Sequence, residues 1–111
     1  MNKRKNSAPT KRGPFTFTSH GRTYKVDVVS MSYGNGRTAL VLLGQNGERV
    51  AVATVNLPDA LLQPGHLHIK TWAENESMLD FLTSNGIVRD TGVDVPTGFC
   101  QARVVELMEV A

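Results

Sequence analysis

Two histidines, His66 and His68, are the one pair of residues in this sequence with metal-ligand spacing. Residues two apart on a β-strand project to the same side, so two imidazoles at this spacing can share one ion. A metal site also needs a third ligand, and the candidates are His20, Glu74, Asp94 and Cys100. The simpler interpretation, which we favour, is two solvent-facing strand histidines. A small metal- or ligand-binding domain that uses both is the third functional hypothesis.

The single cysteine, Cys100, is the only candidate nucleophile that we consider. A thiol needs a base beside it and a depressed pKa to act in catalysis. Its neighbours Ala102 and Val104 fall on the same face of a predicted apolar strand, which favours a small core residue. The sequence has no Gly-x-Ser-x-Gly elbow and no phosphate-binding glycine loop leading into a helix. It therefore predicts a protein that is not an enzyme and needs no cofactor.

Three acidic residues, Glu74, Glu76 and Asp80, lie at and near the start of a predicted helix. Acids at this end of a helix interact favourably with the helix dipole and keep the surface soluble, which is the simpler interpretation. The functional alternative is a recognition patch for a basic partner. These three acids are therefore the candidate partner-binding residues.

The basic residues near the N-terminus are the strongest functional signal in the sequence. Residues 1–13 hold five basic residues and no acid, and they lack apolar periodicity, so we expect a disordered tail. A basic arm neutralises phosphates and gains affinity from counterion release without any folded geometry. No aromatic residue in the tail could stack on bases. The candidate nucleic-acid-binding residues are Lys3, Arg4, Lys5, Lys11 and Arg12.

The rest of the chain has the opposite charge. The 111 residues have a formal net charge of +2, but residues 14–111 hold seven basic residues and all ten acids, a net charge of −3. A chain of this length suits a single domain with one core. A lone cysteine, no signal peptide and no apolar run of about 18 residues predict a cytoplasmic protein that does not contact a membrane.

Most of the elements that position these residues are predicted strands with period-two alternation. The predicted strands are residues 15–18, 22–33, 38–43, 49–57, 66–72 and 99–108. The second to fourth are long and joined by tight glycine turns at 34–36 and 46–47, so they should form an antiparallel meander. Residues 38–43 are almost all apolar, which favours a central strand. A phase slip at Val28 and Val29 predicts a bulge there.

One short helix is predicted between the last two strands. Asn75 is its candidate N-cap, and Asn85-Gly86 its end. Its apolar stripe consists of Met78, Leu79, Phe81 and Leu82. Residues 87–98 are expected to form a loop. The predicted fold class is α+β: an antiparallel β-sheet, made of the three-stranded meander and further strands, with the short α-helix packed on it, in a single domain over residues 14–111.

Residues 55–99 resemble a known group of proteins through short sequence motifs. These are Val55-Asn56-Leu57-Pro58, Ile69-Lys70, Glu74-Asn75-Glu76, Gly86-Ile87-Val88 and Thr97-Gly98-Phe99. The stretch resembles a family of uncharacterised small proteins encoded by plasmids, integrative elements and phages. The resemblance implies a genomic setting and carries no catalytic residues.

Small accessory proteins of mobile elements often act by binding a host protein, including defence machinery. The leading functional hypothesis is therefore a non-enzymatic accessory protein of a mobile genetic element that binds a host protein, with inhibition of a host defence system as one such role. The alternative is a nucleic-acid-binding protein anchored by the basic N-terminal tail.

Overall fold

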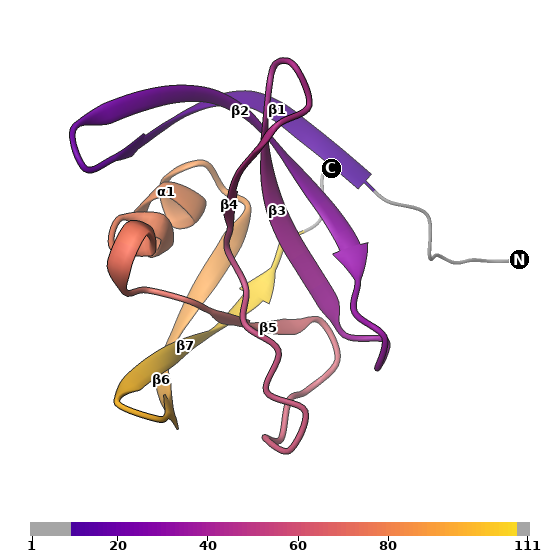
Figure 1. Ribbon diagram of the computed structural model, residues 1–111. Helices are drawn as coiled ribbons and strands as arrows, with labels where there is room; N and C mark the ends of the chain where they lie inside the picture. Colours follow the sequence, from indigo (N-terminus) through magenta and orange to yellow (C-terminus); the bar gives the residue numbers. More distant parts are fainter. Residues whose placement is uncertain (1–9, 109–111) are drawn as a thin grey trace, which may run out of the picture.

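The computed structural model describes residues 10–108 of the chain. Within them, antiparallel β-strands make up most of the fold, and one short α-helix packs at one side of them (Figure 1). The elements are β1 (Thr10–Ser19), β2 (Arg22–Ser32), β3 (Thr38–Gly44), β4 (Arg49–Val52), β5 (His66–Ile69), the 3-10 helix η1 (Ala73–Asn75), α1 (Met78–Ser84), β6 (Val88–Thr97) and β7 (Cys100–Leu107). The predicted α+β class is confirmed.

The strands form two antiparallel sheets, one ordered β1-β2-β3-β4 and the other β5-β7-β6. The predicted meander is the β2-β3-β4 part of the first sheet. Its turns contain Gly36 and Gly47, which have φ angles of 86° and 83° that favour glycine. β3 is an inner strand and is buried on both faces, as its apolar sequence predicts.

A short extended segment after β4 joins the two sheets. The Ala53 amide donates to the Leu40 carbonyl at 2.8 Å, and the Ala53 carbonyl accepts from the Lys70 amide at 2.8 Å. Thr54 then forms an isolated antiparallel bridge with Ile69. The predicted strand 49–57 is thus divided between the sheets, and one core runs beneath both.

The helix α1 closes this core. Met78, Phe81 and Leu82 are buried, and the Phe81 ring meets the Phe17 ring edge-on at a centroid distance of 5.1 Å. Figure 1 shows α1 between the β1-β2 hairpin and the β6-β7 hairpin. The predicted apolar stripe is confirmed, and so is the end at Asn85, which occupies the C-cap. No helix within residues 10–108 is long and apolar enough to span a membrane.

The N-terminal boundary of the folded part lies earlier than predicted. Residues 10–13 belong to β1, where Thr10 pairs with Ser30 and Arg12 pairs with Val28. The predicted disorder is therefore wrong for these four residues, and the rest of the predicted tail, 1–9, lies outside the described residues. The composition of residues 10–13 does not predict a strand. The segment is ordered because the long strand β2 supplies its hydrogen-bonding partners.

The predicted bulge in β2 is also wrong. The pairing of β2 with β3 runs unbroken from Val26 to Ser32, and the register shift lies in β1, between Arg12 and Phe15. Val28 and Val29 are both buried because the two faces of β2 are covered here. The two consecutive valines occur because both faces of the strand are buried here, and not because the alternation of the strand shifts by one residue.

Residues 88–97 form a strand, β6, where a loop was predicted. In β6 the register shifts between Asp90 and Val93, and Thr91 and Gly92 form the bulge. Pro96 is tolerated because β6 is an edge strand. The bulge and the proline interrupt the alternation by which a strand is recognised in a sequence.

Asn75 does not cap the helix. Its side chain is fully buried, and its Nδ2 donates to the Val52 carbonyl at 2.7 Å. The N-cap position of α1 belongs to Ser77, whose hydroxyl donates instead to the Thr18 carbonyl at 2.7 Å. Both polar residues thus tie the helical segment to the first sheet.

Candidate functional site

The two histidines of β5 have different surroundings. His66 is half-buried, with its Nδ1 3.2 Å from the Pro64 carbonyl oxygen. His68 is only 2 % exposed, and its buried Nε2 has no hydrogen-bond partner. Burial lowers the pKa of His68, and the nearby Arg37 charge lowers it further. The prediction that both histidines face solvent is therefore wrong for His68.

The described residues offer no third metal ligand to His66 and His68. Over residues 10–108, no three His, Cys, Asp or Glu side chains are grouped so as to hold a metal ion. Among the candidate third ligands, Glu74 pairs with Lys70 at 3.2 Å and Asp94 pairs with Arg103 at 2.7 Å. The described part of the chain thus gives the metal hypothesis no support.

Cys100 begins β7 and pairs with Thr97 across the β6-β7 turn. It is partly buried, whereas Ala102, two residues later, is fully buried. Cys100 was expected to be a small core residue, but its side chain is only partly buried.

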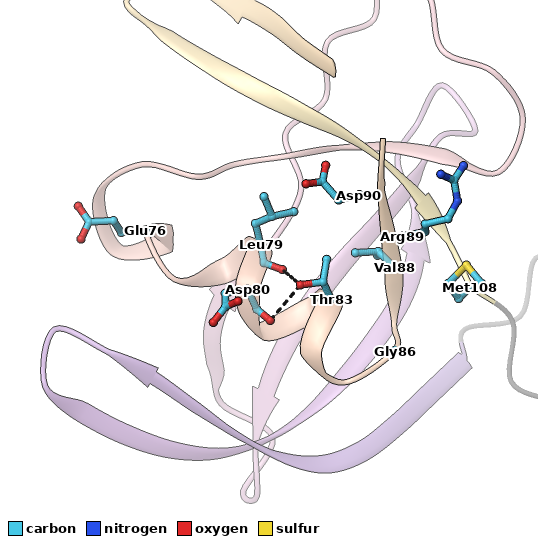
Figure 2. A pocket seen from close by; sticks show the side chains of 9 residues that line it. All are labelled: Glu76, Leu79, Asp80, Thr83, Gly86, Val88, Arg89, Asp90 and Met108. Carbon is cyan, nitrogen blue, oxygen red and sulfur yellow. Dashed lines mark hydrogen bonds between the residues drawn. The ribbon is translucent and has the colours of Figure 1, made fainter. Parts of the chain in front are cut away.

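The three acids of the predicted recognition patch do not line one hollow. Figure 2 shows Glu76 and Asp80 at a hollow of about 730 Å³ beside α1, where Arg89 and Asp90 of β6 also lie. Glu74 lines other hollows. A backbone hydrogen bond to its carboxyl group lowers the pKa of that group, and its pairing with Lys70 lowers the pKa further. The structure thus separates Glu74 from the other two acids.

Two of the five predicted nucleic-acid-binding residues lie in the described part of the chain, both in β1. Lys11 forms an ion pair with Asp27 at 3.8 Å, and the Arg12 guanidinium donates to the Met108 carbonyl. Lys3, Arg4 and Lys5 lie outside the described residues. Lys11 and Arg12 are therefore parts of a strand and not of a free arm.

A different surface is a largely apolar hollow beside β6 and β7. We call it the Leu61 groove; it has a volume of about 550 Å³ and lies between residues 61–66 and the outer face of β6 and β7. Leu61 is 97 % exposed and Val93 52 % exposed. The groove is lined by Leu61, Leu62, Gln63, His66, Thr91, Val93, Val95 and Val104. None of these side chains is an acid, a lysine or an arginine.

One side of the Leu61 groove is a loop held in place by an arginine. The Arg37 guanidinium donates to the Leu57 carbonyl at 2.6 Å and to the Ala60 carbonyl at 2.7 Å. The far end of the loop is fixed because the Leu107 amide donates to the Gly65 carbonyl at 2.8 Å. Leu61 is therefore presented to solvent by a loop that is anchored at both ends.

The other side of the groove depends on the bulge in β6. The Thr91 hydroxyl donates to the Val104 carbonyl at 2.6 Å and accepts from the Val93 amide at 3.2 Å. Beyond the bulge, Val93 pairs with Val104 and Val95 pairs with Ala102. The bulge thus fixes the register in which Val93, Val95 and Val104 line one wall.

Inspection of the sequence did not identify this groove. Its one detectable signal was the apolar pair Leu61-Leu62 between Pro58 and Pro64. Val93 and Val95 gave no signal because their segment was interpreted as a loop.

Comparison of the chain with protein-family models, with curated proteins and with solved structures gave no match.

Proposed function

We propose that this protein is a non-enzymatic accessory protein of a mobile genetic element, and that it acts in the cytoplasm by binding a host protein through the Leu61 groove. Inhibition of a host defence system is one role that this binding would serve. The mobile-element setting comes from the resemblance of residues 55–99. The binding surface comes from the exposed apolar side chains.

The observation that carries the proposal is the exposure of large apolar residues around a hollow. Leu61 and Val93 project from two anchored elements that border the Leu61 groove. Exposed large apolar side chains gathered around a hollow mark interaction sites, where a few large side chains supply most of the affinity. Because the lining carries no acid, lysine or arginine, the occupant that fits is an apolar segment of the host protein.

Affinity capture from a host lysate tests this proposal when it is run with groove variants. The wild-type protein should retain one host protein, identified by mass spectrometry, and Leu61→Asp with Val93→Asp should reduce its recovery at least about tenfold. Both side chains are exposed, so the variant should unfold at the wild-type temperature.

The matched control is Met31→Asp, which places a new charge at another exposed apolar residue, on β2. The control should retain the partner. Equal recovery by the groove variant and the wild type would reject the groove as the binding surface. A groove variant that lost only self-association, measured by light scattering, would show that a second copy of the chain is the occupant, which also contradicts the proposal.

A further inference from the structure

The open edge of β4 lies beside a second surface, which has different chemistry. Two hollows, of about 560 and 150 Å³, share Val50, Ala51 and Glu74 and therefore adjoin; together we call them the β4 groove. The connection from β5 to α1 forms one wall, and in Figure 1 it passes beside β4. The Asn75 and Lys70 hydrogen bonds to Val52 and Ala53 hold that wall in place.

Basic residues from three separate segments line the β4 groove. Arg22 comes from the start of β2, Arg49 from the start of β4, and Lys70 from the residue after β5. Glu74 is the one acid in the lining and pairs with Lys70. Within residues 10–108, neither Arg22 nor Arg49 forms an ion pair. The groove therefore carries a net positive charge, although residues 14–111 are acidic overall.

Aromatic residues also line the β4 groove, next to these basic residues. The larger hollow is lined by Tyr33 and Trp72, and the smaller one by Tyr24. All three are partly exposed. The Lys70 ammonium lies 5.9 Å from the centre of the Trp72 ring, and the Arg22 guanidinium lies 5.5 Å from that of Tyr24. Each of these two rings thus has a cation next to it.

We propose that the β4 groove binds single-stranded nucleic acid. The exposed parts of the Trp72, Tyr24 and Tyr33 rings can contact unpaired bases. The net positive charge of the groove attracts the phosphates of the same strand. A duplex hides the faces of its bases within the stack, so it could use only the cations. DNA and RNA single strands share this chemistry. The inference concerns a surface separate from the Leu61 groove and goes beyond the proposed function.

The aromatic residues distinguish this surface from a simple basic patch. An acidic protein partner would use the positive charge of Arg22 and Arg49. It would not need the aromatic rings of Tyr24 and Trp72. Stacking on a ring contributes affinity that does not depend on base sequence. The expected ligand is therefore bound with little sequence preference.

Trp72 is the only tryptophan of the chain, so its fluorescence reports directly on this groove. Titration of the full-length protein with an oligothymidylate of about 12 nucleotides at low salt should quench the fluorescence. An oligouridylate of equal length tests RNA in parallel. A duplex of equal length and polyglutamate should bind weakly and produce little quenching. Tight binding of polyglutamate together with absence of quenching by both oligonucleotides would overturn the proposal in favour of an acidic protein.

Variants separate the stacking contribution from the charge contribution. Trp72→Ala should weaken binding about tenfold by fluorescence anisotropy of a labelled oligonucleotide, and Trp72→Phe should restore most of the loss. Arg22→Gln with Arg49→Gln should reduce the slope of log affinity against log salt by about 1.4. Both arginines are exposed, so this double variant tests the groove even if Trp72→Ala fails to fold.

Two controls locate the binding. Phe99→Ala removes an exposed aromatic residue outside the groove and should leave the affinity unchanged. A full-length variant with Lys3, Arg4 and Lys5 all changed to Gln should retain the quenching and most of the affinity. If that variant loses binding while Arg22→Gln with Arg49→Gln binds as the wild type does, the N-terminal residues are the site and the inference is wrong.

Discussion

At the scale of single residues, His68 is a buried titratable side chain on β5. It is 2 % exposed, and its Nε2 has no hydrogen-bond partner within the described residues. Burial and the Arg37 charge both oppose its protonation, which lowers its pKa below the ordinary value of 6.5. The neutral imidazole is the form that the folded protein accommodates.

We expect the stability of the protein to fall on mild acidification because of His68. The unfolded chain takes up a proton below pH 6.5 more readily than the folded chain does, so the free energy of unfolding declines as pH falls past that value. One such group adds a slope of at most about 1.4 kcal/mol per pH unit. Urea unfolding at pH 7.5 and 5.5 should show this decline in the wild type and a smaller one in His68→Leu.

The half-buried neighbour supplies a matched variant for this measurement. His66→Asn should keep the acid sensitivity of the wild type, since His68 is unchanged. A decline that is the same in His68→Leu as in the wild type would assign the pH dependence to other groups.

At the scale of elements, the loop 57–65 depends on one arginine. Hydrogen bonds from a charged donor are worth about 1.5 to 3 kcal/mol, and Arg37 makes two of them to this loop. We predict that Arg37→Met exposes the loop to limited proteolysis after Leu61 or Leu62 and weakens capture of the host partner. The wild-type loop should resist cleavage under the same conditions.

Arg49→Met is the control for this prediction, because it removes an exposed arginine that makes no ion pair within residues 10–108. It should leave the cleavage rate unchanged. Identical cleavage of Arg37→Met and the wild type would mean that Arg37 does not anchor the loop.

The elements also show what alternation in a sequence can reveal. β2, β3 and β4 were predictable because apolar residues alternate or run together between glycine turns. β6 was missed because the bulge at Thr91 and Gly92 shifts the alternation midway through the strand. A bulge depends on hydrogen bonds to a neighbouring strand, and the sequence of one strand does not contain them.

At the scale of the whole molecule, the two sheets should unfold together. The core cluster contains Val28 and Leu42 from the first sheet and Leu67 and Val105 from the second. Asn75 crosses from η1 to Val52, and the Ala53 backbone bonds to both sheets. We therefore expect unfolding curves from Trp72 fluorescence and from far-ultraviolet circular dichroism to coincide.

Asn75→Ala tests this cooperativity, because it leaves the buried Val52 carbonyl without its side-chain donor. It should lower the free energy of unfolding by about 1 to 3 kcal/mol and shift both curves equally. Asn85→Ala, at the exposed end of α1, should have a smaller effect. Separation of the two curves in Asn75→Ala would show that the sheets unfold independently.

The two grooves could be identified only from the folded structure. His66 and His68 were identified from spacing, but the spacing did not reveal that His68 is buried whereas His66 is only half-buried. Trp72 carried no signal in the sequence because its neighbours in the β4 groove, Arg49 and Tyr33, are distant along the chain. Spacing in a sequence reports on one element, whereas both grooves are assembled from several.

The start of β1 at Thr10 changes what the basic N-terminus can do. Thr10 is hydrogen-bonded to Ser30, so the chain is fixed at that point. Lys11 and Arg12 follow at once on the same strand, where Lys11 pairs with Asp27 and Arg12 donates to the Met108 carbonyl. A polyanion would therefore meet these two charges at one fixed place on the first sheet, with an orientation set by the strand and not by the ligand.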